Sequence, residues 1–396
     1  MDMIYSKMKR KIIEINPVNP VNPVKNMKPI EMWKELISSE SNEQEMRMRL
    51  EEIYRNNRPF IAEIIMNSHC PSRCLHCIYA PDYERYNKNM AMSEWEAAFR
   101  IIHDTLGFKK FILDGRGFSR ESIQAIRYLK ENFEGIKVGL IMDGVSAEPF
   151  IEELIQYPPD WLDVSVDGLE REHDKQRNHE GAYRKTIDAL IQLKESQAFE
   201  KINILTCLTT INIESLPFMM NSLNMEGFKN FFVAPVSILS GYRPDKNLQP
   251  TEEEFVRFLD ELMGTTRSLS DSWVEVDIYD ALFSGAIRHL RAEIFKEFKT
   301  EKDHLEMVQK LDGNEIHVCY FPSSLIGARE FIVNSDGTII PPKVMAMGKI
   351  PSNMIMGNVL ALDKEKRFFD QLTEHEVFSV FTRELIEERD LLGALP

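Results

Sequence analysis

From residue 59 onward, short apolar runs alternate with longer amphipathic stretches. The apolar runs lie at 59–66, 108–115, 136–144, 161–168, 202–209 and 230–236. Each has the length of a buried strand, and most are followed by enough residues for a helix, as at 119–133. A capping box at Ser93 and Glu96 is expected to open another helix. Strands that alternate with helices predict a parallel sheet with right-handed crossovers, and six of them suffice for a partial (β/α)6 TIM-like barrel.

The segments outside these runs have different patterns. The chain divides into four predicted parts: 1–58, 59–240, 241–310 and 311–396. The first contains a threefold Asn-Pro-Val repeat and an acidic stretch, which predict an extended arm and a helix. The third predicts a helical connector, with helices at 251–264 and about 278–311. The last has a hairpin turn at Asp336-Gly337 and a final amphipathic helix. The predicted fold is therefore α/β, with a partial barrel and a small α+β C-terminal domain.

Composition and charge narrow the functional classes. The 396-residue chain is 43% hydrophobic, which is enough for a substantial core, and its formal net charge is −15. Binding of an extended nucleic acid draws on clustered Lys and Arg, so this acidity argues against such a partner. We find no run of 18 uncharged apolar residues and no secretory signal, so no membrane partner is expected. The sequence predicts a cytoplasmic protein.

Three of the five cysteines lie within eight residues. Cys70, Cys74 and Cys77 follow the first predicted strand with the spacing C-x3-C-x2-C. Three thiolates on one tight loop at the carboxyl end of a barrel strand can hold three irons of a cubane cluster and leave the fourth iron without a protein ligand. The alternative is a zinc site completed by His69 or His76, although zinc sites usually combine two pairs of ligands. Both interpretations make this loop a metal site.

This cysteine loop, placed after the first strand of a partial barrel, resembles the hallmark of the radical S-adenosylmethionine (SAM) superfamily. The resemblance implies one [4Fe-4S] cluster, whose unliganded iron is chelated by the amino and carboxylate groups of SAM. An electron from the reduced cluster then cleaves SAM to methionine and a 5′-deoxyadenosyl radical, which abstracts a hydrogen atom from the substrate. His76 occupies the position where the family usually has an aromatic residue near the adenine. A reducing partner such as flavodoxin or ferredoxin is implied as well.

The turn after the second predicted strand resembles the family's Gly-Gly-Glu-Pro motif, which holds the methionine amino group. The matching residues here are Asp114 and Gly115, followed by Arg116 and Gly117. Because Arg116 stands where the acid would be, the resemblance assigns the acidic role to Asp114. A plain β-to-α turn would also explain the two glycines.

Later positions resemble other SAM-binding motifs of the family. Asp143 lies in a Met-Asp-Gly turn that resembles Thr-Asn-Gly, while Ser165 and Asp167 lie in a stretch that resembles Ser-Leu-Asp-Gly. Alternation places Ser165 and Asp167 on one face of their strand. Arg177 ends a His-Asp-x-x-Arg stretch, and the resemblance places this arginine at the SAM carboxylate. Val233, in the sixth predicted strand, completes the set of expected SAM-binding residues.

The C-terminal part resembles a SPASM or twitch domain, which in many members binds auxiliary iron–sulfur clusters. This sequence departs from the pattern, because Pro341-Pro342 replaces a cysteine and no cysteine follows Cys319. An auxiliary cubane needs three or four thiolates, so we expect a degenerate, cluster-free domain that closes the barrel mouth. Cys207 and Cys319 remain as candidate catalytic thiols that donate a hydrogen atom to a substrate radical. The alternative is that both are small buried residues.

The resemblance implies a radical SAM enzyme, a lyase, isomerase or oxidoreductase, acting on a small-molecule or peptide substrate in natural-product or cofactor biosynthesis. The absence of an auxiliary cluster favours redox-neutral chemistry. Two alternatives remain open. One is a peptide-modifying maturase or epimerase, and the other is a non-catalytic scaffold that holds zinc or another metal with the same three cysteines.

Overall fold

The computed structural model describes most of the chain from Lys28 to Leu392. The described residues are 28–57, 59–70, 72–77, 88–114, 117–236, 246–279, 298–300, 304–340, 352, 355–362, 372–373 and 375–392. The Asn-Pro-Val repeat, Gly115, Arg116 and Pro341-Pro342 lie outside them.

The described strands form one continuous sheet. They are β1 (Ile61–Ile65), β2 (Lys110–Asp114), β3 (Lys137–Met142), β4 (Trp161–Ser165), β5 (Ile202–Leu208), β6 (Asn230–Pro235), β7 (Trp273–Ile278), β8 (Phe298–Thr300), β9 (Leu305–Leu311), β10 (Asn314–Tyr320), β11 (Glu330–Val333), β12 (Thr338–Ile340) and β13 (Gly357–Asn358). Their order across the sheet is β13-β12-β11-β1-β2-β3-β4-β5-β6-β7-β10-β9-β8. The six predicted strands are β1 to β6, and they lie side by side in chain order.

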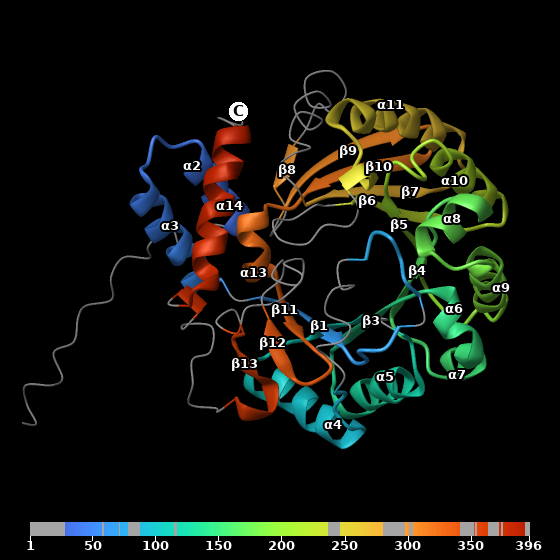
Figure 1. The fold of residues 1–396 in the computed structure, drawn as a ribbon, viewed down its shortest axis with the longest axis horizontal. Coiled ribbons are helices and arrows are strands. Elements are labelled where there is room, and N and C mark those ends of the chain that lie inside the picture. The colour runs from blue at the N-terminus through green and yellow to red at the C-terminus, as the bar shows by residue number, and fades with distance from the viewer. Residues whose placement is uncertain are drawn as a thin grey trace, which may run out of the picture.

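The central part of the sheet is parallel. Neighbouring strands from β1 to β7 pair in parallel, as do β7 with β10 and β1 with β11. The sheet curls into an open barrel, and its end strands β13 and β8 do not pair with each other among the described residues (Figure 1). The predicted α/β fold with a partial barrel is therefore confirmed. The C-terminal strands extend the same sheet on both sides of the six predicted strands.

The helices cover the outer face of this barrel and one of its sides. They are α2 (Pro29–Ile37), α3 (Glu43–Asn56), α4 (Met92–Arg100), α5 (Arg120–Asn132), α6 (Gly144–Ala147), α7 (Ile151–Gln156), α8 (Glu170–Arg177), α9 (Ala182–Glu195), α10 (Leu216–Met225), α11 (Glu252–Ser268), α13 (Ile326–Arg329) and α14 (Val377–Leu392). Short turns of other helical types are η3 (Ile101–Thr105), η4 (Glu148–Phe150), η5 (Lys246–Leu248), η7 (Ser323–Leu325) and η10 (Val359–Ala361). Helices α4 to α11 lie between successive strands and on the outside of the sheet (Figure 1). No helix in the described ranges is both long and apolar enough to span a bilayer.

The predicted helix at 278–311 is wrong where the structure describes that segment. Strands β8 and β9 lie there, and β7 precedes them. The connection from β9 to β10 turns at Asp312-Gly313, where both residues have positive φ (52° and 95°). An Asp-Gly pair between two alternating runs is a strong hairpin signal. The period-two alternation of apolar residues therefore prevailed over helix propensity here. The other predicted connector helix is confirmed as α11.

The predicted capping box at Ser93 and Glu96 is displaced by two residues. Helix α4 begins at Met92, and the carboxylate of Glu94 accepts a hydrogen bond from the backbone N–H of Ala91 at 2.8 Å. The glutamate at the third helical position thus closes the first turn without a capping hydroxyl. A side-chain carboxylate near the helix N-terminus is stabilising by itself.

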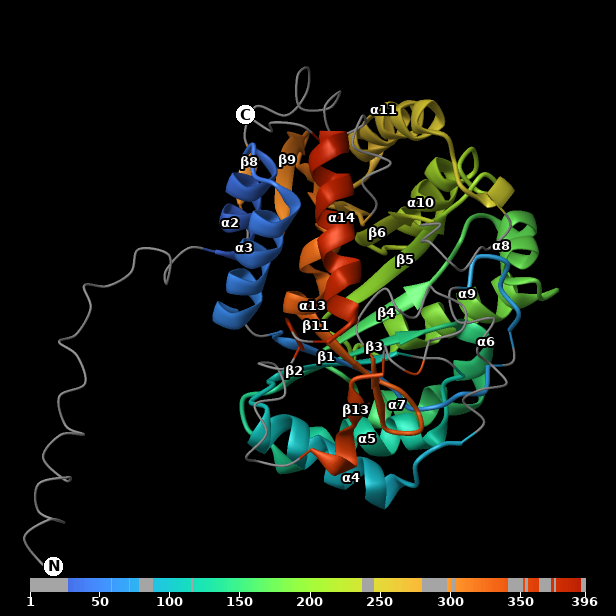
Figure 2. The ribbon, with the colours of Figure 1, turned by 60° about the vertical axis from the view of Figure 1, so that its left-hand side comes forward.

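The N- and C-terminal helices meet beside the barrel. Helix α14 lies against α2 and α3 (Figure 2). The buried carboxylate of Glu388 accepts hydrogen bonds from the indole N–H of Trp33 at 2.8 Å and the backbone N–H of Ser324 at 3.1 Å. The predicted C-terminal hairpin is also confirmed, since β11 and β12 are antiparallel and Gly337 in their turn has φ of 81°. The two ends of the chain thus close one side of the fold.

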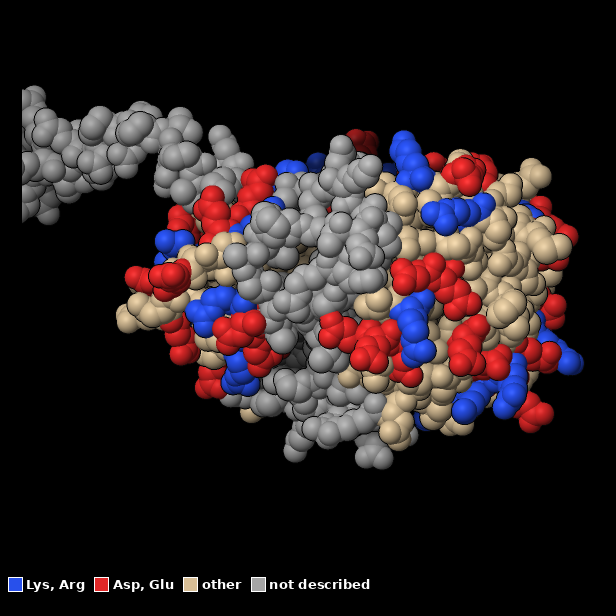
Figure 3. Space-filling model, turned by 90° about the horizontal axis from the view of Figure 1, so that it is seen from above, with Lys and Arg blue, Asp and Glu red and all other residues tan. Residues whose placement is uncertain are grey.

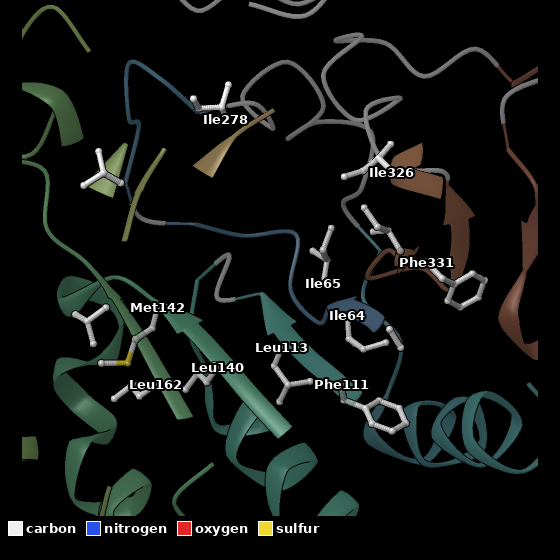
Figure 4. Close-up of a cluster of buried hydrophobic side chains, with 14 of the residues drawn as sticks. Ile64, Ile65, Phe111, Leu113, Leu140, Met142, Leu162, Ile278, Ile326 and Phe331 are labelled. Carbon is white, nitrogen blue, oxygen red and sulfur yellow. The ribbon is translucent and has the colours of Figure 1, made fainter. Parts of the chain in front are cut away.

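The hydrophobic core lies between the sheet and the outer helices. In β2, Phe111 and Leu113 are buried, and together with Leu140 and Leu162 of the next strands they pack in one apolar cluster (Figure 4). The alternate residues of each strand point to the concave inner face of the sheet. The polar residues on that inner face therefore form the candidate site.

The outer surface of the molecule carries charges of both signs, which are interspersed on the face shown in Figure 3.

Candidate active site

The cysteine loop leaves the carboxyl end of β1 and is held by backbone contacts. All three of its cysteines are free thiols; Cys70 is buried, and Cys74 and Cys77 are half-buried. The backbone N–H of Leu75 donates to the carbonyl of Gln176 at 2.9 Å, which ties the loop to the end of α8. The loop thus has a fixed place above the inner face of the sheet.

A glycine lets the turn after β2 approach this loop. Gly117 has φ of 60°, and a Cβ atom at this position would lie 1.8 Å from the carbonyl oxygen of His69. Both the positive φ and the lack of space favour glycine. The side chain of Asn67 donates to the carbonyl of Gly117 at 3.1 Å and strengthens this contact. The segment predicted to bind SAM therefore packs on the backbone of the cysteine loop.

The donor set of the loop fits an iron–sulfur cluster. Its three thiols lie on one short loop, and three thiolates can hold three irons of a cubane cluster while the fourth iron stays open. A structural zinc ion needs four protein ligands. A separate compact group of ligand atoms, all within 4.8 Å of one another, is formed by Glu275, Asp277 and Cys319.

A buried ion pair lies next to the loop. The Nε atom of Arg177 is 2.6 Å from Oδ2 of Asp167, and its Nη1 donates to Sγ of Cys74 at 3.8 Å. The Asp167 side chain is fully buried, and its Oδ1 accepts a hydrogen bond from the backbone N–H of Cys207 at 2.9 Å. His76 Nε2 lies 3.9 Å from the same carboxylate. A cation, an anion and a thiol of the cysteine loop are thus brought together at the carboxyl ends of β1, β4 and β5.

Burial and this ion pair set the protonation states. Burial would raise the pKa of Asp167, but Arg177 and His76 lower it below its usual value, so the carboxylate is ionised. Burial lowers the pKa of His76 and of His173 to about 4, so both imidazoles are neutral at pH 7. Burial raises the pKa of the Cys74 thiol to about 12, and the Arg177 cation opposes that rise.

Three further predicted SAM-binding residues lie at the same end of the sheet as this ion pair. Asp143 caps α6 by accepting from the backbone N–H and the hydroxyl of Ser146, both at 2.8 Å, and its charge acts on Arg177. Ser165 is largely buried on the same face of the chain as Asp167. Asp114 is half-buried at the end of β2.

Two predicted site residues lie elsewhere. Val233 belongs to the hydrophobic core with 1% exposure, on the face of β6 opposite to Phe232. Cys319 is buried on β10, paired with Asp277 of β7, and burial together with the charge of Asp277 raises its pKa. Cys207, by contrast, lies close to Asp167 and Cys74, and burial raises its pKa too. The structure therefore separates the two candidate catalytic thiols.

Two functional positions escaped the sequence analysis. Gln176 is fully buried; its amide donates to the carbonyl of Cys207 at 2.8 Å and accepts from the hydroxyl of Thr209 at 2.6 Å. Asn212 donates to the same carbonyl at 2.9 Å. These amides fix the carboxyl end of β5 next to the cysteine loop. The position of Gln176 directly before Arg177 was the available signal.

A family model described as the radical SAM superfamily matches residues 64–223. That span runs from β1 to α10 and includes the cysteine loop, Asp167 and Arg177. The chain contains a radical SAM domain. A [4Fe-4S] cluster and SAM are the cofactors that this match supports. No curated protein matches the chain.

Solved structures support the fold of this chain. Native anSMEcpe with bound AdoMet shares 15% identity at a TM-score of 0.54, covering 81% of this chain and 84% of its own. SuiB of Streptococcus suis bound to the precursor peptide SuiA shares 15% identity at a TM-score of 0.58, covering 95% of this chain and 77% of its own. These coverages extend the likeness beyond residue 223 into the C-terminal strands.

Proposed function

We propose that this chain is a radical SAM enzyme in which Cys70, Cys74 and Cys77 bind one [4Fe-4S] cluster. It would act on a small-molecule or peptide substrate held on the inner face of the barrel. The observation that carries the proposal is the convergence of three free thiols with the Arg177–Asp167 ion pair at the carboxyl ends of parallel strands. Such strand ends are where barrel enzymes place their catalytic groups.

Different side chains bind and orient the cofactors. When bound, the cluster supplies the electron that cleaves SAM. Arg177 offers donors to Cys74, and charge-assisted contacts of this kind stabilise a thiolate ligand. Asp167 holds Arg177 in place and remains ionised. His76 is neutral and largely buried in the cysteine loop, where its ring can stack on an adenine.

Cys207 is the better placed of the two candidate hydrogen donors. Its neighbours include Asp167, Arg177 and Cys74, and its raised pKa keeps the sulfur protonated. A neutral thiol can give its hydrogen atom to a carbon radical, forming a C–H bond and leaving a sulfur radical. That radical regains an electron from a flavodoxin- or ferredoxin-type reductant and a proton from solvent. Cys319 lacks these neighbours and serves in our proposal as a packing residue.

A peptide-modifying maturase is the second candidate. SuiB was solved with a precursor peptide, and its fold matches 95% of the present chain. The likeness concerns the fold, so it places a peptide beside a small metabolite among the candidate substrates. The pairing of β11 with β1 brings the C-terminal strands next to the cysteine loop, where they can shape either kind of pocket.

Anaerobic reconstitution with iron and sulfide tests the proposal. We expect about four irons per chain, a broad absorption band near ~400 nm and SAM-dependent 5′-deoxyadenosine on reduction with dithionite. Cys74→Ala should lose all three, and Cys319→Ala, a cysteine outside the loop, should retain them. A colourless protein holding about one zinc would refute the enzyme proposal. Roughly eight irons would overturn the single-cluster assignment.

A further inference from the structure

A cavity of about 640 Å³ opens at the opposite end of the barrel, where β2 to β7 begin. Its walls include Lys110, Lys137, Trp161, Asn203, Asn230 and Trp273. We propose that this amino-terminal mouth is a second binding site, for a planar aromatic carboxylate. The proposed radical chemistry does not use this end of the sheet. The volume lies in the range of small-molecule sites.

The cavity has room because each of two tryptophan rings covers a residue of the adjacent strand on the side away from β5 and β6. Trp161 of β4 pairs with Gly139 of β3, and a Cβ atom on Gly139 would lie 2.1 Å from the indole, so the ring covers that glycine. Trp273 of β7 stacks on His317 of β10 with ring centroids 3.6 Å apart and an interplanar angle of 18°. The strands between them, β5 and β6, are left uncovered.

Between the two indoles the wall is made of amides. Asn203 and Asn230 are cross-strand partners, and Asn230 in turn pairs with Trp273. The amide N–H of Asn203 donates to Asp163 at 2.7 Å, which fixes the side chain in the wall of the cavity. Phe232 adds a third aromatic wall on the same face of β6 as Asn230. A flat ring fits between aromatic walls, and amides at the base can orient it.

The indoles are fixed before any ligand binds. Trp161 donates its N–H to Asp163 at 3.1 Å, and Trp273 donates its N–H to Glu275 at 3.0 Å. The same Trp-x-acid pattern thus occurs at the start of two strands. Because both N–H groups are already used, the rings offer aromatic surface rather than hydrogen bonds. A preformed wall of this kind lowers the entropic cost of binding.

The charge of the cavity favours an anion. Four lysines and three carboxylates line it, whereas the whole chain has a net charge of −15. Asp160 and Lys137 are paired with each other, since the two Asp160 oxygens accept from Lys137 and from the backbone N–H of Val138, each at 2.9 Å, so three lysines and two carboxylates of the lining lie outside this pair. Lys110 lies 5.3 Å from the centre of the Trp161 ring, so an anion on a ring stacked there would meet an ammonium group. The ligand we infer therefore combines one negative charge with a flat aromatic body.

The cavity is separate from the cluster site. Asn203 and Cys207 lie on the same face of β5, four residues apart, which corresponds to about 13 Å of strand. Binding at the mouth should therefore not require iron or SAM. The inference stands independently of the proposed function, and metal-free protein is suitable for its test.

Isothermal titration of full-length, metal-free protein with 2-naphthoate tests the site. We expect saturable binding of one molecule per chain, accompanied by a change in tryptophan fluorescence. The neutral 2-naphthylmethanol should bind at least tenfold more weakly, and the cationic 2-naphthylmethylammonium more weakly still. Absence of saturable 2-naphthoate binding, or equal binding of the three compounds, would overturn the proposal.

Two variants locate the binding. Asn230→Trp fills the cavity and should reduce 2-naphthoate affinity by tenfold or more. Lys110→Gln removes charge without adding bulk and should reduce it several-fold, which keeps the test open if the larger change prevents folding. The matched control is Lys185→Gln, an ion-paired surface lysine on α9, which should bind as the wild type does. Wild-type affinity in both cavity variants would place the ligand elsewhere. Cys74→Ala should bind 2-naphthoate unchanged, so loss of the cluster and loss of this site are distinguishable.

Discussion

Two aspartates on one face of the same chain segment have opposite electrostatic environments. Asp163 lies in β4 near the amino-terminal mouth, and Asp167 lies just beyond the carboxyl end of that strand. Burial raises the pKa of Asp163 to about 6, and its partners Asn203 and Trp161 are neutral. Asp167 is buried as well, yet Arg177 and His76 lower its pKa below the usual value.

The two ends of the barrel thus differ in the kind of partner that they provide for a buried carboxyl group. At the cysteine loop, charge is neutralised within the protein by a 2.6 Å ion pair that also reaches Cys74. At the mouth, the side-chain carboxyl groups of Asp163 and Glu275 accept the indole N–H groups of the aromatic walls, and lysines are part of the lining. A site that binds a charged cofactor needs its own charges fixed in advance. A hollow with an excess of cations can instead accept its counter-charge from a ligand.

Breaking the ion pair should give the largest effect on stability. Asp167→Asn leaves the Arg177 guanidinium buried without its anion, and loss of one partner from a buried pair costs about 3–5 kcal/mol. Urea unfolding of the metal-free protein at pH 7 measures the change. Arg177→Met in the same background should recover part of the loss, because it removes the unpaired charge. A loss below about 1 kcal/mol in Asp167→Asn would show that solvent already screens the pair.

Replacing one glycine by alanine at each end of the barrel should give the next largest difference in stability. Gly117→Ala places a Cβ on the His69 carbonyl at a positive φ, so backbone must move, and we expect a cost of about 3 kcal/mol. The three atoms nearest to a Cβ at Gly139 belong to the Trp161 side chain, which can shift if it gives up its hydrogen bond to Asp163, so a cost of about 1 kcal/mol is expected. Gly117→Ala should also lower iron occupancy, and Gly139→Ala should alter tryptophan fluorescence.

Gly264 provides the control for both substitutions. It lies within α11, and a methyl group added at this glycine would have nothing within 4 Å, so Gly264→Ala should be neutral or stabilising by up to about 1 kcal/mol. Equal costs at Gly117 and Gly139 would contradict the distinction between a rigid backbone contact and a movable side chain.

The sequence predicted what depends on local pattern. The six central strands and the hairpin at Asp336-Gly337 follow from alternation and turn residues, and cysteine spacing marks the cysteine loop. The sequence did not reveal that Val233 lies in the core. Its strand, Asn-Phe-Phe-Val-Ala-Pro, is apolar on both faces, so alternation alone does not say which face points into the barrel. The cavity depends on which neighbour each tryptophan covers, and that direction is set by Gly139 and His317 across strands.

The two aspartates should also differ in their pH dependence. The pKa of Asp163 is raised when folded, so the folded chain binds the extra proton and stability falls as pH rises from about 4 to 6. Asp163→Asn should remove that fall, gaining about 2 kcal/mol relative to wild type between pH 4 and 7. For Asp167, stability is present above its unfolded pKa of about 4 and is lost as pH falls through the lower folded value. Urea unfolding at each pH measures both, and a parallel pH profile for Asp163→Asn and wild type would contradict the assignment.

Cys207→Ala should have the smallest effect on structure. The hydrogen bonds at this residue, to Asp167, Gln176 and Asn212, use its backbone N–H and carbonyl, so they survive removal of the thiol. We expect less than about 1 kcal/mol of lost stability, with iron content and SAM cleavage unchanged. Cys319→Ala, at a position with 1% exposure, should cost somewhat more because it leaves a cavity. Loss of iron in Cys207→Ala would instead make this thiol a ligand. Intact iron and cleavage are expected both for a hydrogen donor and for a small buried residue, so they would exclude only the role of a ligand.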